Sequence, residues 1–328
     1  MKDIGLVGVP YSGRSTLFKA LTHTGVLGGR ANQAVVPVPD PRLEVLARLE
    51  KSRKVVPAQV RFVDVPGATS AQGLATLRET DALCIVLRAF GADPEPGREL
   101  AEVTADLILA DLGTVESALE NARRRMKGRV RGEEASEVRP LEEAHAALSG
   151  EVLLRDADLD VETPRALQAL APLTLKPWVI VANLEEGTSV PEGLPVGTVG
   201  VWAEIEAETA SMPEEEALAL LREFGVERPG LQSVISACYQ ALDLITFLTT
   251  GEDETRAWEV RRGATAPEAA GVIHSDLQRG FIRAEVVTFD DLVEAGGWDA
   301  AKHKGHLRVE GKDYLVREGD ILHVRFAV

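Results

Sequence analysis

The residues best suited to chemistry lie near the start of the chain, where a short apolar segment leads into a glycine-rich loop. Gly8 and Gly13 are separated by four residues and are followed by Arg14 and Ser15. This order matches the phosphate-binding P-loop, G-x-x-x-x-G-K-[ST], with arginine in place of the lysine. In such a loop backbone N–H groups surround phosphate oxygens, and the next helix points its positive end at them. The sequence therefore predicts a phosphate site, with the Ser15 hydroxyl where a magnesium ligand is needed.

A second motif ends the strand predicted over residues 59–64, which runs into Asp64-Val65-Pro66-Gly67. Asp-x-x-Gly is frequent in ordinary turns, but here it stands at the tip of an apolar strand downstream of a P-loop. In P-loop nucleotidases this aspartate holds Mg²⁺ through water, and the glycine N–H meets the γ-phosphate. We therefore expect Asp64 and Ser15 to serve magnesium and Gly67 to contact the terminal phosphate.

A third motif, Asn183-Leu184-Glu185-Glu186, ends the strand predicted over residues 178–182. In guanine-nucleotide-binding domains the strand in this position ends in Asn-Lys-x-Asp, and the aspartate pairs with two guanine donors. Here Asn183 is kept, whereas Leu184 and Glu186 replace the lysine and the aspartate. Because specificity depends on pairing those buried donors, the longer carboxylate weakens the case for GTP.

The elements that must position these motifs follow an α/β pattern. Strands and helices alternate over residues 1–110 and return over 172–244, which indicates one nucleotide-binding domain built on a mostly parallel sheet. Residues 111–171 carry apolar side chains at helical spacing and are expected to form an inserted helical hairpin. Residues 245–328 read as a small α+β domain of short strands and turns. Its last predicted strands are 307–309, 314–317 and 321–326.

Six positive charges lie within nine residues of the predicted hairpin. They are Arg123, Arg124, Arg125, Lys127, Arg129 and Arg131. Cations near the C-terminal end of a helix are favourable, so the cluster can be a solvated helix end. On a chain that is otherwise acidic, it can also be a contact to the phosphate backbone of RNA. The sequence leaves both readings open.

The composition of the whole chain excludes several classes of protein. A formal net charge of −16 over 328 residues disfavours a protein that coats nucleic acid with its whole surface. We expect no membrane segment and a cytoplasmic location, because no apolar run approaches about 20 residues and no signal pattern is present. Cys84 and Cys238 lie in apolar surroundings, which predicts buried thiols in a reducing compartment rather than zinc ligands.

Several long strings, taken with the three motifs, resemble the YchF subfamily of Obg-like P-loop proteins over nearly the full length. The most specific are Arg256-Ala257-Trp258, Gly263-Ala264-Thr265-Ala266-Pro267 and Gly280-Phe281-Ile282-Arg283-Ala284-Glu285. The resemblance implies a P-loop domain related to G domains, a coiled-coil insert, and a C-terminal TGS domain with a ubiquitin-like β-grasp fold. It also implies slow hydrolysis of nucleotide, ATP favoured over GTP, and association with the ribosome.

Carried onto this sequence, the family pattern assigns every part of a nucleotide site. The phosphates would be held by Tyr11, Ser12, Gly13, Arg14, Ser15, Thr16 and Gly67. The base would be faced by Asn183, Leu184, Glu186 and Ala203. Mg²⁺ bound with ATP or GTP would be served by Ser15 and Asp64.

The departures from the family pattern concern catalysis. The family has lysine where this chain has Arg14, and a planar guanidinium does not substitute for a compact ammonium in a tight loop. The loop over residues 25–34 is short and lacks the threonine that completes the magnesium shell in the family. The segment after Gly67 is also short. Ala68 fits the family, in which a hydrophobic residue follows Asp-x-x-Gly in place of a water-positioning glutamine, and it offers no catalytic side chain. Trp202 stands where a small residue is expected near the base.

Three hypotheses follow from these observations. The first is an ATP-binding protein with slow or residual hydrolysis that acts with the ribosome. The second is a non-catalytic adaptor in which the nucleotide site is vestigial and other surfaces bind RNA or ribosomal protein. The third, an active GTPase switch, is disfavoured because both switch segments and the guanine-specific motif depart from the pattern. Nothing in the sequence requires more than a monomer.

Overall fold

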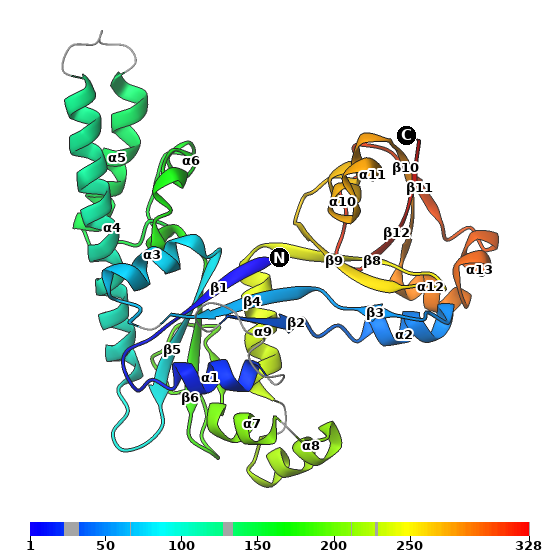
Figure 1. Cartoon of the computed structure of the whole chain (residues 1–328), viewed down its shortest axis with the longest axis horizontal. Helices are drawn as coiled ribbons and strands as arrows, with labels where there is room; N and C mark the ends of the chain where they lie inside the picture. Colours follow the sequence, from blue (N-terminus) through cyan, green and yellow to red (C-terminus); the bar gives the residue numbers. More distant parts are fainter. Residues whose placement is uncertain (23–32, 66, 127–133, 211, 227–228, 328) are drawn as a thin grey trace. The chain divides into compact units, whose positions relative to one another are not determined.

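The computed structural model describes residues 1–22, 33–65, 67–126, 134–210, 212–226 and 229–327 (Figure 1). The chain divides into two compact units. One comprises Lys2–Val35 and Arg61–Cys238 and contains the P-loop; the other comprises Met1, Val36–Val60 and Tyr239–Val328. The predicted boundaries instead assigned residues 36–60 to the nucleotide-binding domain.

The P-loop belongs to a six-stranded sheet with strand order β2-β4-β1-β5-β6-β7. Its strands are β1 (Lys2–Val7), β2 (Gln33–Pro37), β4 (Gln59–Asp64), β5 (Ala82–Ala89), β6 (Trp178–Leu184) and β7 (Val199–Val201). The pairs β1–β5, β5–β6 and β6–β7 are parallel. Five consecutive side chains of β5, Leu83 to Leu87, are fully buried, as expected for a central strand covered on both faces.

The parallel register brings the predicted motifs to one edge of this sheet. Val7 lies opposite Ile85, and Asn183 lies opposite both Arg88 and Val201. The P-loop and the Asn183 motif therefore both follow strands that end at the same edge. In open α/β sheets this carboxyl edge is where ligands bind.

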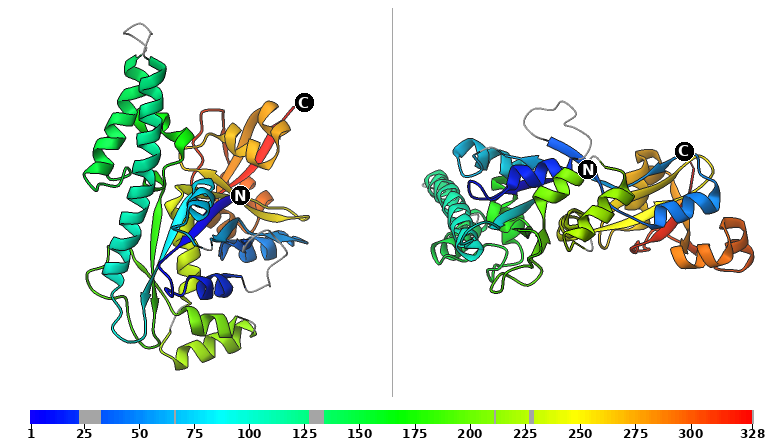
Figure 2. Two further views of the ribbon diagram at one scale, coloured as in Figure 1. Left: turned by 60° about the vertical axis from the view of Figure 1, so that its left-hand side comes forward. Right: turned by 90° about the horizontal axis from the view of Figure 1, so that it is seen from below.

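Helices accompany the sheet in the same unit (Figure 1). They are α1 (Arg14–Leu21), α3 (Ala71–Glu79), α4 (Pro96–Met126), α5 (Glu134–Ser149), α6 (Thr163–Ala166), α7 (Ala203–Thr209), α8 (Glu214–Glu223) and α9 (Gly230–Ala241). The long helices α4 and α5 lie side by side in each view (Figure 2). Their shared core includes Ile108, Val115, Ala144 and Leu148, so burial of apolar side chains holds the pair together.

A buried ionic network anchors α4 to its neighbours. Asp111 of α4 is fully buried, and its Oδ1 lies 2.7 Å from Nη1 of Arg78. Its Oδ2 accepts hydrogen bonds from the backbone N–H and the hydroxyl of Thr174 at 2.7 and 2.8 Å. A buried carboxylate with all its acceptors engaged is held in one position. This fixes the wall of α4 that faces the P-loop.

The other unit contains a mixed six-stranded sheet of order β11-β10-β12-β8-β9-β3. Its strands are β3 (Val55–Val56), β8 (Leu244–Thr249), β9 (Thr255–Arg261), β10 (Phe281–Thr288), β11 (Arg308–Glu310) and β12 (Asp320–Phe326). Its helices are α2 (Arg42–Glu50), α10 (Ala266–Ile273), α11 (Ser275–Arg279), α12 (Phe289–Ala295) and α13 (Trp298–His303). Phe247, Val286 and Leu322 lie in its core.

The strand predicted over residues 314–317 is wrong. Only Leu315 forms a bridge, an isolated one to Thr265. The flanking groups bind Asp320 instead: Oδ2 of this carboxylate accepts from the Tyr314 hydroxyl at 2.6 Å and from the Arg317 N–H at 2.9 Å. The backbone N–H of Arg317 thus binds a side chain instead of a neighbouring strand. The prediction of two buried thiols is confirmed, since Cys84 and Cys238 are both buried and unbridged.

Candidate functional site

The P-loop joins β1 to α1 through a turn that requires glycine at its end. Gly13 has φ +84°, in the left-handed region, and a Cβ there would lie 2.0 Å from Nδ2 of Asn183. The side chain of Asn183 therefore occupies the space that any other residue at position 13 would need. Ser12, one residue earlier, is buried, and its Oγ has no hydrogen-bond partner among the described residues. An unpaired buried hydroxyl in this loop suits a ligand that supplies oxygen atoms.

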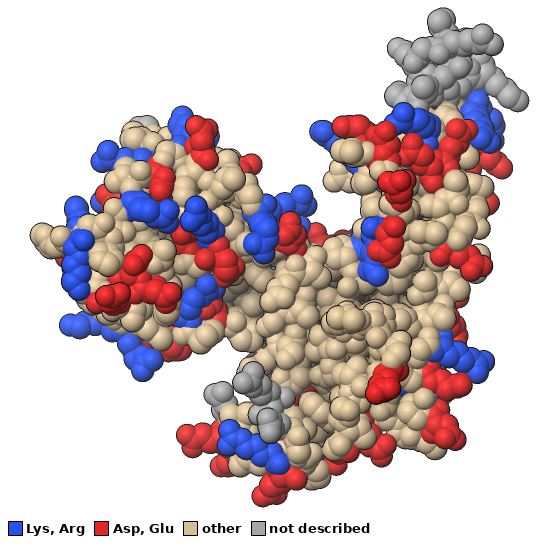
Figure 3. Space-filling model, turned by 180° about the vertical axis from the view of Figure 1, so that it is seen from behind, with Lys and Arg blue, Asp and Glu red and all other residues tan. Residues whose placement is uncertain are grey.

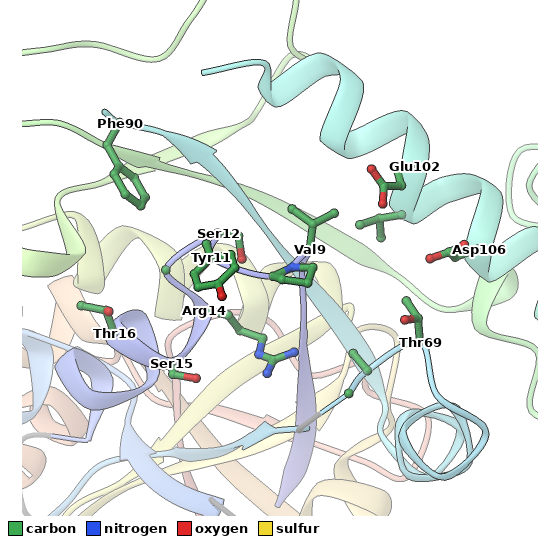
Figure 4. Close-up of a pocket in the computed structure, with 16 residues that line it drawn as sticks. Val9, Tyr11, Ser12, Arg14, Ser15, Thr16, Thr69, Phe90, Glu102 and Asp106 are labelled. Atoms are coloured by element: carbon green, nitrogen blue, oxygen red, sulfur yellow. The ribbon is translucent and has the colours of Figure 1, made fainter. Parts of the chain in front are cut away.

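A cavity of about 670 Å³ opens over this loop (Figure 4). Its lining includes all seven residues predicted to hold phosphates: Tyr11, Ser12, Gly13, Arg14, Ser15, Thr16 and Gly67. The opposite wall comes from α4, which places Glu102 and Asp106 across from the P-loop, with Phe90 at one end. The P-loop thus borders a hollow large enough for a polyphosphate, and carboxylates face it from the other side.

The ionic centre beside this cavity consists of Arg14, Ser15 and Asp64. Asp64 ends β4 and is only 3% exposed. Nε of Arg14 lies 2.6 Å from its Oδ1, and the Ser15 hydroxyl donates to its Oδ2 at 3.0 Å. The Arg14–Asp64 contact is an ion pair without hydrogen-bond geometry, because neither atom has a hydrogen-bond partner among the described residues. The arginine that replaces the P-loop lysine therefore lies against the aspartate expected to serve magnesium.

These residues, as arranged, do not fit a magnesium ion. Both oxygens of Asp64 are engaged, one by a fixed positive charge and one by the hydroxyl expected to be a metal ligand. A divalent cation at this carboxylate would meet the guanidinium at close range, where like charges repel strongly. No group of three or more His, Cys, Asp or Glu in the described part of the chain could hold a metal. The roles of Ser15 and Asp64 in magnesium binding stay a prediction.

A second cavity, of about 570 Å³, adjoins the first through Gly13, Thr16 and Phe90, which line both. Three of the residues predicted to face the base line it, namely Asn183, Leu184 and Glu186. Ala203 does not line it, but its N–H donates to Oδ1 of Asn183 at 3.2 Å. Trp202 is part of the lining. The structure therefore brings together the base-site residues predicted from separate parts of the chain.

Asn183 connects the two cavities. It is buried, its Nδ2 donates to the Ser12 carbonyl at 3.3 Å, and its Oδ1 accepts from Ala203. One amide thus satisfies groups on both the P-loop and the base loop, which consists of Trp202 and Ala203 at the start of α7. Because each side of a buried amide is paired, moving either loop would leave a polar group without a partner.

Glu206 of α7 is a site residue that the motifs did not reveal. It is 1% exposed, and its carboxylate accepts from the N–H groups of Trp202, Gly230 and Leu231 at 3.2, 2.9 and 3.0 Å. Burial raises the pKa of the Glu206 carboxyl, although these three donors oppose the shift. The side chain ties the base loop to the start of α9, so it positions the base cavity without lining it.

Phe90, Glu102 and Asp106 were also not predicted. Phe90 follows β5, a buried strand whose C-terminal end lies at the ligand edge, so its position was a usable signal. The two carboxylates lie one turn apart on α4, and nothing in the sequence distinguished them from other charged residues on that helix.

The basic cluster is partly neutralised within the helix pair. Arg123, Arg124 and Arg125 lie 2.7, 3.5 and 3.5 Å from carboxylates of Glu142, Glu120 and Glu137. Basic and acidic side chains are intermingled on this part of the surface (Figure 3). Exposed pairs of this kind contribute little energy, so the arginines remain open to exchange partners. Lys127, Arg129 and Arg131, the rest of the predicted cluster, lie outside the described residues.

The fold and the cavity define an α/β protein with a P-loop at the ligand edge of a largely parallel sheet. A family model named YchF-GTPase_C, described as "protein of unknown function (DUF933)", matches residues 244–327. The chain is 39% identical to "Ribosome-binding ATPase YchF" of Haemophilus influenzae and 36% identical to that of Bacillus subtilis, over 99% of both chains in each case. The chain belongs to the YchF family.

The solved structures agree with this assignment. The structure titled "Structure of the Schizosaccharomyces pombe YchF GTPase" matches with a TM-score of 0.87 and 29% identity, over 99% of this chain and 97% of that one. The alignment with the Haemophilus influenzae relative spans 361 positions against 328 residues here, so at least 33 positions (361 − 328) have no counterpart in this chain. In the part of the chain that the structure describes, no helix is both long and apolar enough for a bilayer.

Proposed function

We propose that this chain binds ATP in preference to GTP, hydrolyses it slowly and acts with the ribosome. The observation that carries the proposal is the bridge made by Asn183, which joins the P-loop to the base loop across two adjoining cavities. Phosphates would lie against the backbone of Tyr11 to Thr16 and near Gly67. The base would lie beside Leu184 and Glu186, with Phe90 between the two halves.

The preference for ATP rests on Glu186. A guanine-specific site presents an aspartate that accepts from two guanine donors, and the longer Glu186 in its place does not reproduce that geometry. Slow hydrolysis rests on the phosphate half. Arg14 is paired with Asp64, and Ala68 beside Gly67 carries no group that could orient a water molecule.

The proposed association with the ribosome rests on the relatives, which are named "Ribosome-binding ATPase YchF". Within the proposal, residues 1–110 and 172–244 form the G-domain-like part, and residues 111–171 form a helical hairpin. Residues 245–328 form a TGS domain of β-grasp type, the region that the family model matches. A ribosomal partner would place the chain in the cytoplasm, where it would act as a monomer.

Nucleotide binding is tested by equilibrium titration of the full chain with ATP, GTP and ADP, followed by single-turnover hydrolysis. We expect ATP to bind more tightly than GTP and to be hydrolysed slowly, faster in Arg14→Lys than in the wild type. Tight GTP preference would contradict the role given to Glu186. Failure of all three nucleotides to bind at millimolar concentration would leave the non-catalytic adaptor, which the Arg14–Asp64 pair also favours.

The ribosome contact is tested by co-sedimentation over a range of salt concentrations. Neutralising Arg123, Arg124 and Arg125 to Gln is expected to weaken association and to flatten its salt dependence, since each lost phosphate contact lowers the salt slope. Arg98→Gln is the matched control for Arg124→Gln. Both arginines are exposed on α4 and paired with a glutamate of the same segment. Equal co-sedimentation of all variants would reject this role.

A further inference from the structure

The carboxylate of Asp64 already has a cation beside it. Asp64 is almost fully buried at the end of β4, where an ionised carboxylate needs a compensating charge. In a P-loop site with lysine, a bound divalent cation supplies that charge from the ligand side. Here Nε of Arg14, 2.6 Å from Oδ1, supplies it from within the loop.

An arginine can neutralise this carboxylate through Nε and still carry two terminal nitrogens further along the side chain, whereas a lysine carries a single ammonium. The Nε–H of a guanidinium lies close to the side-chain stem, whereas its four other N–H donors lie at the far end. Nε of Arg14 lies 2.6 Å from Oδ1 of Asp64, a charge contact without hydrogen-bond geometry, and Arg14 also lines the phosphate cavity (Figure 4). One side chain thus spans the distance between a buried carboxylate and the place of the phosphates, which is the task of the metal in related sites.

The charges of the two arrangements differ. A lysine, a magnesium ion and an aspartate together present a net charge of +2 to the nucleotide, whereas Arg14 and Asp64 together present zero. ATP that carries Mg²⁺ would bring a second cation against the guanidinium, at the cost of their repulsion. Metal-free ATP would find its partners already in place: the loop N–H groups, the N-terminus of α1 and the guanidinium.

From these contacts we infer that Arg14 replaces the divalent cation and that this site binds its nucleotide without magnesium. The inference rests on the proposed nucleotide binding and deepens it, because it states the form in which the nucleotide binds. The two carboxylates of the opposite wall, Glu102 and Asp106, form no metal site with any third group among the described residues.

The test compares ATP binding by the full-length wild type in excess Mg²⁺ and in excess EDTA, measured by calorimetry at constant ionic strength. We expect the Kd in EDTA to equal or fall below the Kd in Mg²⁺. A Kd that rises about tenfold or more in EDTA, as for a metal-bridged site, would overturn the inference and leave the proposed function standing. No binding in either condition would overturn both.

Two variants, one at Arg14 and one at a control position, show whether Arg14 is the cause of magnesium-independent ATP binding. Arg14→Lys restores a point charge that leaves Asp64 open to a metal, so its affinity for ATP should become magnesium-dependent by about tenfold. Arg98→Lys, at an exposed position outside both cavities, should behave like the wild type. Magnesium independence that persists in Arg14→Lys would show that another group plays this role. Circular dichroism of each variant confirms that the fold is retained.

Discussion

The two halves of the proposed nucleotide site, the phosphate cavity and the adjoining base cavity, are built on different physical principles. The base half is held by neutral hydrogen bonds to backbone groups through Asn183 and by three backbone donors converging on Glu206. The phosphate half is held by charge: Arg14 and Asp64 neutralise each other, and Ser15 completes the cluster. The first is fixed by geometry, whereas the second can exchange partners when a charged ligand arrives.

Within the proposed function, this difference explains how the chain could bind ATP and yet hydrolyse it slowly. Leaving a buried hydrogen-bonding group unpaired costs about 1–3 kcal/mol, so the base half tolerates little change. In the phosphate half, Arg14 replaces the lysine of the P-loop pattern. In related enzymes the charge at this position stabilises the transition state. Substitutions in the two halves should therefore have different effects on stability and on affinity.

The largest effect on ATP affinity is expected at Gly13, which lines both cavities. Gly13→Ala places a Cβ within 2.0 Å of Nδ2 of Asn183 and forces an L-residue to keep φ +84°. Strain of about 1–2 kcal/mol and loss of the Asn183 bridge should together weaken ATP binding by about a hundredfold. Gly225→Ala is the control, because Gly225 has φ +78° but open space around its Cα. Similar ATP affinity in both variants would contradict the bridge.

The next largest effect is expected in the base half. Glu206→Gln replaces an acceptor by an N–H₂ group facing a backbone donor, which should lower the free energy of unfolding by about 1–3 kcal/mol. Glu208→Gln, two residues along α7 and exposed, should change it by less than about 0.5 kcal/mol. Urea unfolding of both variants measures the difference. Equal stability would show that the three contacts to Glu206 do not position the loop.

The free energy of unfolding should also depend on pH, and the direction of this dependence follows from the pKa of Glu206. Because the pKa of Glu206 is raised in the folded state, the folded protein keeps a proton that the unfolded chain has already released. Stability should therefore fall as the pH rises from the ordinary pKa, about 4.5, through the raised value. The slope should be smaller in Glu206→Gln and unchanged in Glu208→Gln. Unfolding curves across this pH range measure it, and parallel curves for all three proteins would exclude a raised pKa.

A smaller effect, and of opposite direction, is expected in the phosphate half. Asp64→Asn removes the partner of Arg14 and leaves the guanidinium for the ligand, so metal-free ATP should bind about three- to tenfold more tightly. Asp253→Asn makes the same change at a 92% exposed position and should leave affinity unchanged. Weaker binding by Asp64→Asn would indicate that the pair orders the loop rather than competing with the phosphates.

The smallest effect concerns the far wall of the phosphate cavity. Removing both charges by Glu102→Gln with Asp106→Asn should favour ATP over ADP by about two- to threefold, because ATP carries the extra phosphate charge. Titrations with both nucleotides at low salt give the ratio. A ratio equal to that of the wild type would show that solvent screens these carboxylates fully.

Much of the site could be predicted because motifs at strand ends meet at one edge of a parallel sheet. All seven predicted phosphate residues line one cavity, and Asn183, Leu184 and Glu186 line the adjoining one. Glu206 could not be found in this way, because a buried glutamate capped by distant N–H groups has no local pattern. The strand predicted over residues 314–317 failed for a related reason: the side chain of Asp320 accepts from the Arg317 N–H, a backbone group that strand pairing would use.

By itself, the sequence determined the alternation of strands and helices around the P-loop, the P-loop itself and the family, because these depend on local spacing and on residue type. Only the tertiary structure decided what Arg14 does. In the sequence, Arg14 is one positively charged residue in the place of another, the P-loop lysine. The two differ in the length and shape of the side chain. The structure places Nε of Arg14 at 2.6 Å from Asp64, a residue fifty positions away that only the fold brings to its side. Contacts between distant residues depend on the packing of the whole sheet, which no local pattern records.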